Sequence, residues 1–157
     1  MTRKSISASV IAQASTAAVW AVLTDLDSVT TVLPDVVSLE RLSDDTGFSL
    51  GTRWRETRKI MGKESTEEMW VTQIQDRVGY VVEAQSRGIH YRSQYTIAAK
   101  GDGTEILLEF SGEHTEPSMF KTMTMNLMYM LMSGVTRKML TKDLQAMAHA
   151  AEASDAG

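Results

Sequence analysis

The stretch PSMFKTMTMNLMYMLMSGVTRKMLTKDLQAMAHAA, residues 117–151, predicts one long helix that is too apolar for an ordinary surface helix. It holds eight of the eleven methionines of the chain: Met119, Met123, Met125, Met128, Met130, Met132, Met139 and Met147. Methionine is unbranched and polarizable, so it fills irregular spaces and adapts to varied partners. A helix of this composition, laid across a sheet, favours a protein that encloses an adaptable apolar cavity.

Length and composition favour one domain. The chain has 157 residues, of which 43% are hydrophobic, and this suffices for a sizeable core. We expect the domain to cover residues 1–152, with residues 153–157 as a frayed polar tail. The net charge of −4 argues against nucleic-acid binding, and the lack of cysteine excludes disulfides and thiolate chemistry. Since no apolar run has signal-peptide or membrane-span length, a cytoplasmic location is the simplest interpretation.

Strands and short helices are predicted before the long helix. The first is a half-buried strand, predicted by apolar residues that alternate with serines at Ile6, Ala8, Val10 and Ala12. Ser15 is then expected to cap a short helix, and Asp27 a second one that ends near Leu33, before Pro34. Six further strands are predicted over residues 36–43, 52–61, 64–75, 79–87, 89–100 and 104–114. Their short connections join antiparallel neighbours, so we expect an antiparallel meander.

Several motifs resemble those of the START-like (SRPBCC) superfamily, which includes polyketide cyclases, Bet v 1 relatives and lipid-transfer domains. They are AAVWAVLTDL at 17–26, Leu33-Pro34, GTRWRETR at 51–58, Gly62-Lys63-Glu64 and Gly103-Thr104-Glu105. The resemblance spans nearly the whole chain and is strongest to small bacterial polyketide cyclase/dehydrase-like proteins. It implies an α+β helix-grip fold, with a seven-stranded curved antiparallel sheet wrapped around a long C-terminal helix and two short helices after strand 1. Such a fold does not by itself determine function.

Strand alternation predicts which side chains face the concave side of the sheet. In the last three strands this inward set includes Tyr80, Val82, Tyr91, Ser93, Tyr95, Leu108, Phe110 and His114. In the middle hairpin, a two-residue turn at Gly62-Lys63 places opposite each other Trp54 and Val71, Glu56 and Met69, and Arg58 and Glu67. The more apolar face, taken as inward, then also holds three charges.

Those inward charges, Glu56, Arg58 and Glu67, have two interpretations. Isolated buried charges are costly, but an Arg58–Glu67 pair with Glu56 nearby can be satisfied in a partly hydrated pocket. The trio is either a solvated cluster near a strand end or a polar anchor that orients a ligand. The expected ligand-binding residues are Trp54, Glu56, Arg58, Glu67, Met69, Val71, Tyr80, Tyr91, Tyr95, Leu108, Phe110, His114, Met119, Met123, Leu127 and Leu131.

No catalytic motif is evident in the sequence. There is no Gly-x-Ser-x-Gly, the three histidines lack metal-ligand spacing, and Gly101-Asp102-Gly103 is a turn, so we expect no metal and no cofactor. His114 is the one candidate general base, although a structural role at the core or rim is the commoner one for such a histidine. We therefore assign no catalytic residue.

The long helix is expected to bend. The centre of its apolar arc shifts near Ser133-Gly134, and glycine is a usual kink site. The Met-rich half before this point is expected to line the cavity and gate its mouth. Simple core packing and a homodimer seam are the alternatives.

Three functions are compatible with these features. The leading hypothesis is binding or transport of a hydrophobic small molecule, such as a lipid, fatty acid or polyketide-like compound, in an internal cavity. The alternative is a polyketide cyclase or aromatase that uses Glu56, Arg58, His114 or the tyrosines as acid–base groups. A third is a protein that docks a partner chain on its Met-rich helix. The sequence indicates a cavity and a polar anchor more clearly than a proton-transfer pair, so we favour a binding protein over an enzyme. We expect a monomer or weak homodimer with no nucleic-acid partner, and transient membrane contact is compatible with these features.

Overall fold

The computed structural model describes residues 4–86, 88–115 and 134–156. Its centre is a seven-stranded antiparallel sheet with the strand order β1-β7-β6-β5-β4-β3-β2. The strands are β1 (Lys4–Ala12), β2 (Val36–Arg41), β3 (Arg53–Ile60), β4 (Lys63–Gln75), β5 (Gly79–Ser86), β6 (Ile89–Lys100) and β7 (Gly103–His114). From β2 to β7 each strand pairs with the next one in sequence, which confirms the predicted meander.

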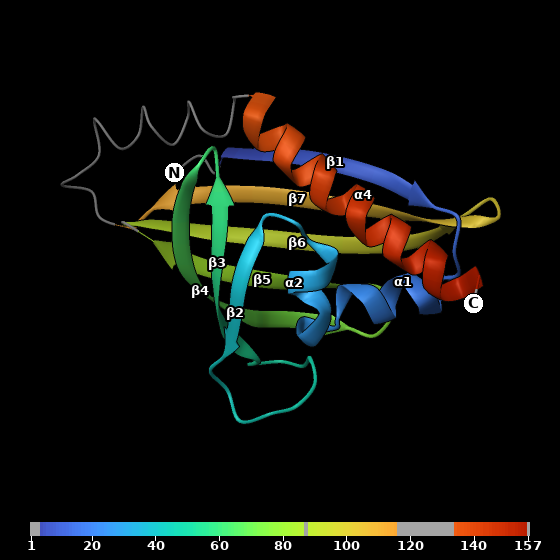
Figure 1. Ribbon diagram of the computed structural model, residues 1–157, viewed down its shortest axis with the longest axis horizontal. Helices are drawn as coiled ribbons and strands as arrows, with labels where there is room; N and C mark the ends of the chain where they lie inside the picture. The colour runs from blue at the N-terminus through green and yellow to red at the C-terminus, as the bar shows by residue number, and fades with distance from the viewer. Residues whose placement is uncertain (1–3, 87, 116–133, 157) are drawn as a thin grey trace.

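Short helices follow β1, and a long helix ends the described chain. They are α1 (Thr16–Leu23), the 3-10 turn η1 (Leu26–Ser28), α2 (Val29–Val32) and α4 (Gly134–Ala156). As predicted, Ser15 caps α1, because its side-chain oxygen accepts a hydrogen bond of 3.1 Å from the backbone N–H of Ala18. The sheet curves around α4, and α1 and α2 lie at one end of the sheet (Figure 1). This arrangement confirms the predicted helix-grip fold.

Two predicted helix boundaries are wrong. Asp27 does not cap a helix, because it lies inside η1, which begins at the buried Leu26, and α2 starts only after Ser28. At the other end, α4 continues through the predicted frayed tail to Ala156. The reason is that the Glu152 and Asp155 carboxylates accept hydrogen bonds of 2.7 and 2.9 Å from the backbone N–H groups of Gln13 and Ser15. These contacts hold the helix end against the end of β1.

The β3–β4 hairpin turns one residue earlier than predicted. Met61 and Gly62 form the turn, and their φ angles of 52° and 82° are both positive, as a type I′ hairpin turn requires. Every cross-strand pair is therefore shifted by two residues: Trp54 lies opposite Met69, Glu56 opposite Glu67, and Arg58 opposite Ser65. The predicted pairs Trp54–Val71, Glu56–Met69 and Arg58–Glu67 are wrong. The predicted inward face is right, because a shift of two residues leaves each side chain on the same face.

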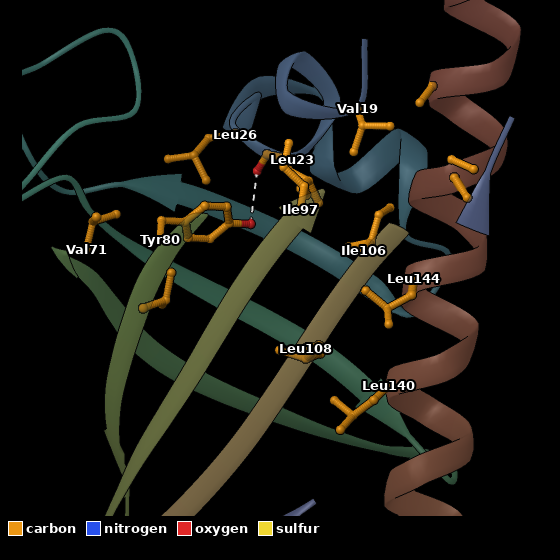
Figure 2. Close-up of a cluster of buried hydrophobic side chains, with 14 of the residues drawn as sticks. Val19, Leu23, Leu26, Val71, Tyr80, Ile97, Ile106, Leu108, Leu140 and Leu144 are labelled. Atoms are coloured by element: carbon orange, nitrogen blue, oxygen red, sulfur yellow. Dashed lines mark hydrogen bonds between the residues drawn. The ribbon is translucent and has the colours of Figure 1, made fainter. Parts of the chain in front are cut away.

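The core lies between the concave face of the sheet and the helices. Figure 2 shows side chains from α1, β6, β7 and α4 that meet there, among them Val19, Ile97, Ile106, Leu140 and Leu144. Ile106 and Leu144 are fully buried, and burial of such a side chain stabilises the fold by about 1.5–3 kcal/mol. Among the described residues, no helix has both the length and the apolar content that a membrane crossing needs.

Candidate ligand-binding cavity

A cavity of about 500 Å³ lies between the concave face of the sheet and the helices. Its described wall has contributions from every layer of the fold. The helices after β1 supply aliphatic side chains, β3 and β4 supply apolar and charged ones, and β5 to β7 supply aromatic ones. On the helix side, α4 supplies Val135, Met139 and Leu140. The interior of the domain is therefore not filled by its own described side chains.

Aromatic rings form much of one wall. Tyr80 and Tyr95 stack with ring centroids 4.8 Å apart, and Phe48 meets Tyr80 edge-on at the same distance. The Tyr80 hydroxyl donates a hydrogen bond of 3.3 Å to the carbonyl of Leu23 (Figure 2). Burial raises the pKa of both Tyr80 and Tyr95, so both phenols are uncharged at neutral pH. This wall is a largely apolar surface with neutral hydroxyl groups.

A charged cluster of Glu56, Arg58 and Asp143 interrupts the apolar wall. The Arg58 guanidinium donates two hydrogen bonds of 3.2 and 3.3 Å to Glu56 Oε1 and one of 2.9 Å to Asp143 Oδ2. The exposed fractions of the Arg58, Glu56 and Asp143 side chains are only 15%, 9% and 8%. Glu56 and Arg58 share a face because they are two residues apart in β3. Asp143 comes from α4, so the cluster joins the sheet to the helix.

The protonation of this cluster follows from its burial. Burial lowers the pKa of Arg58, but the carboxylates of Asp143 and Glu56 more than offset this, and its pKa is raised overall. Burial raises the pKa of Asp143 to about 6 in spite of the attraction of Arg58, and the charge of Glu56 adds to the rise. The Asp143 carboxyl group can therefore exchange a proton near neutral pH, as acid–base catalysts do.

Two polar atoms of residues in the wall are buried without a hydrogen-bond partner among the described residues. They are Trp54 Nε1, a donor, and Asp143 Oδ1, an acceptor. A buried polar atom left unpaired costs about 1–3 kcal/mol, and most such atoms in proteins are bonded. Both atoms are covered by neighbouring groups, so a bound molecule can pair with them only if the Trp54 or Asp143 side chain rotates.

Most residues predicted for the site do line the cavity: Trp54, Glu56, Arg58, Glu67, Met69, Tyr80, Tyr91, Tyr95 and Phe110. Their contact with a ligand remains a prediction. Val71 and Leu108 are instead packed in the core, where exposed fractions of 2% and 1% leave no surface for a ligand. Of His114, only its place in β7 is described. Outside the described residues lie Met119, Met123, Leu127, Leu131 and the predicted bend at Ser133.

Sequence analysis missed Asp143, although a signal for it was present. Asp143 is three residues after Leu140 and four before Met147, so it lies on the apolar stripe of the helix. A carboxylate on such a stripe is buried on docking and needs a partner. Sequence analysis also missed the wall residues from the segments between β1 and β3, which are Leu23, Leu26, Val29, Leu33 and Phe48. The reason is that local patterns do not show where short helices and loops pack.

The described wall combines one charged cluster with a mostly apolar surface. Across the part of the chain that the structure describes, no group of three or more histidine, aspartate or glutamate side chains is placed to hold a metal ion. The charged cluster has a proton-exchanging carboxyl group beside a fixed cation. The rest of the described wall is mostly apolar.

A curved antiparallel sheet that encloses an apolar cavity against a C-terminal helix defines a protein of the helix-grip class. The chain belongs to the family described as polyketide cyclase / dehydrase and lipid transport, whose model matches residues 3–152. This match confirms the resemblance drawn from the sequence motifs. No curated protein sequence matches the chain.

Solved structures from three bacteria share the fold. The protein TTHA0849 from Thermus thermophilus is 18% identical with a TM-score of 0.71, over 96% of this chain and 98% of that one. The Zhui aromatase/cyclase from Streptomyces sp. R1128 is 15% identical with a TM-score of 0.72, over 96% and 94%. A START superfamily protein from Mycobacterium smegmatis is 15% identical with a TM-score of 0.67, over 98% and 97%. At these identities the similarity concerns the fold alone.

Proposed function

We propose that the protein binds a hydrophobic small molecule in the cavity between the sheet and α4. The observation that carries this proposal is the cavity of about 500 Å³ with a mainly apolar wall and a few converging polar groups. Small-molecule sites in proteins have this character and volumes of about 300–1,000 Å³. The family description, which includes lipid transport, supports the proposal. Lipids, fatty acids and polyketide-like compounds are the ligand classes we expect.

Binding can be tested with N-phenyl-1-naphthylamine, an uncharged probe that fluoresces in apolar surroundings. We expect the wild-type protein to bind it and the variant Ser93→Trp to lose most of this binding, because Ser93 lines the cavity and a tryptophan there fills it. Gln94→Trp is the matched control, since the next residue of β6 faces the opposite side of the sheet. Equal binding by both variants would place the probe outside the cavity and contradict the proposal.

The natural ligand can be sought by native mass spectrometry of protein purified without detergent. A cavity of this kind should retain a co-purified apolar molecule, which appears as a mass increment that denaturation removes. The same spectrum gives the oligomeric state, and we expect a monomer or weak homodimer. Transient contact with a membrane, as a source of ligand, is tested separately by sedimentation with lipid vesicles.

A second candidate function is that of a polyketide cyclase or aromatase. The observation that favours it is the Asp143 carboxyl group, whose pKa of about 6 beside the Arg58 guanidinium suits general acid–base catalysis. The test is incubation with a synthetic poly-β-ketone. Cyclisation by the wild type that is lost in Asp143→Asn, while the naphthylamine probe still binds, supports the enzyme. Probe binding without cyclisation supports the binding protein.

A further inference from the structure

The charged cluster in the described cavity wall is unbalanced. It holds two carboxylates, those of Glu56 and Asp143, around the guanidinium of Arg58. Arg58 already donates hydrogen bonds to Glu56 and to Asp143. The cation is therefore shared between two carboxylates, and the cluster has a net negative charge when both are ionised.

Such a wall interacts differently with a ligand that ends in a carboxylate and with one that ends in a hydroxyl group. A carboxylate end adds a further negative charge in surroundings where charges interact more strongly than in water. It also has no proton to donate to Asp143 Oδ1, the buried acceptor that lacks a partner among the described residues. A hydroxyl end has no charge and carries the donor that this oxygen lacks. Since the terminal torsion of an aspartate is soft, its carboxylate can turn Oδ1 toward an incoming hydroxyl.

We propose that the cavity selects apolar ligands whose polar end is an uncharged hydroxyl and discriminates against those that end in a carboxylate, with Asp143 as the group that makes the distinction. This inference rests on the proposed binding function and narrows its ligand class. Alcohols and phenols are preferred to free fatty acids. The selectivity arises from the charge of this cluster, in which Asp143 and Glu56 share the guanidinium of Arg58.

Decan-1-ol and decanoate are a suitable pair of probes, because they share one chain length and differ at the polar end. Each competes with bound N-phenyl-1-naphthylamine at about pH 8, where decanoate and the Asp143 carboxyl group are both ionised. We expect decan-1-ol to displace the naphthylamine at a concentration at least about tenfold lower than decanoate. Because water also solvates a carboxylate better than a hydroxyl, the contribution of the wall itself is measured with variants.

The informative variant is Asp143→Asn, which keeps the side-chain size and removes one negative charge. Among the described residues, Arg58 then keeps Glu56 as its ion-pair partner, so a ligand carboxylate can pair with the freed side of the guanidinium. The preference for decan-1-ol should fall by about tenfold. Asp76→Asn is the matched control, because it makes the same chemical change at a side chain that is 79% exposed, and it should leave the preference unchanged. Glu56→Gln serves as a second informative variant if Asp143→Asn does not fold.

The outcomes separate this inference from the binding proposal. If both cavity variants bind the naphthylamine and keep the wild-type preference, the selectivity proposal is wrong and the binding function stands. If the wild-type protein prefers decanoate, the selectivity proposal is likewise wrong and the binding proposal stands. Failure of the wild type to bind any of the three probes overturns both proposals.

Discussion

The carboxylate of Asp143, in α4, accepts a hydrogen bond of 2.9 Å from the guanidinium of Arg58, in β3. The two residues are 85 positions apart in the sequence and come from the two layers of the fold. Their ion pair joins the helix to the sheet at the cavity wall, and Glu56 holds the other side of the guanidinium. One contact therefore bears on both the stability of the domain and the polarity of its cavity.

Replacement of Arg58 by methionine should destabilise the protein by about 3–5 kcal/mol, because it leaves two buried carboxylates without their shared cation. Urea denaturation gives the free energy of unfolding. Arg55→Met is the control, since Arg55 forms exposed ion pairs with Glu40 and Glu68, which contribute about 0–1 kcal/mol each. Equal losses in the two variants would show that the cluster is hydrated and contributes little.

The pKa of Asp143 predicts a pH dependence of stability. Its rise from the ordinary value of 3.8 to about 6 means that the folded protein binds this proton more tightly than the unfolded chain. Stability should therefore decrease as the pH rises from about 4 to about 6, by about 3 kcal/mol from this group, and change no further above that range. Asp143→Asn should lack this component. The measurement is the difference in unfolding free energy between wild type and variant at several pH values, and a constant difference would contradict the prediction.

Alanine at position 134 should stabilise the protein. Gly134 is the first described residue of α4, and an added Cβ atom meets nothing within 4 Å among the described residues. The gain should therefore be at most the preference of alanine over glycine in a helix interior, about 1 kcal/mol. Gly79→Ala is the contrasting variant, because its Cβ atom meets the backbone carbonyl of Tyr95, and it should destabilise. Thermal unfolding checks both. If Gly134 is also the hinge predicted from the sequence, stopped-flow exchange of the naphthylamine probe should be slower in Gly134→Ala.

The end of α4 should contribute measurably to stability. Asp155 accepts a hydrogen bond of 2.9 Å from the backbone N–H of Ser15, at the cap of α1. Asp155→Ala should therefore cost about 0.5–1.5 kcal/mol. Ser154→Ala is the control at a neighbouring exposed position of the same helix and should cost little. Identical unfolding curves for the two variants would show that the helix end is not held by this contact.

Much of the site could be predicted from local patterns, because the face on which a strand residue lies depends only on its position along the strand. Alternation along β3 identified Trp54, Glu56 and Arg58 as one inward face, and this was right although the predicted register was not. The register depends on which residues take positive φ angles in the turn. A Gly62-Lys63 turn and a Met61-Gly62 turn are both compatible with glycine at position 62, and the difference shifts each cross-strand partner by two residues.

By itself, the sequence predicted the pairing of successive strands from β2 to β7, because their connections are short. It also predicted the inward faces of the strands and a charged group among apolar residues, because periods of two and of 3.6 residues follow from backbone geometry alone. Only the tertiary structure decided that Arg58 pairs with Asp143, that Val71 and Leu108 are covered, and that the helix end is held against Ser15. Each of these depends on how α4 and its neighbours pack against the sheet. Arg58 and Asp143 are 85 positions apart in the sequence, so local patterns can show that each is buried but not that they pair.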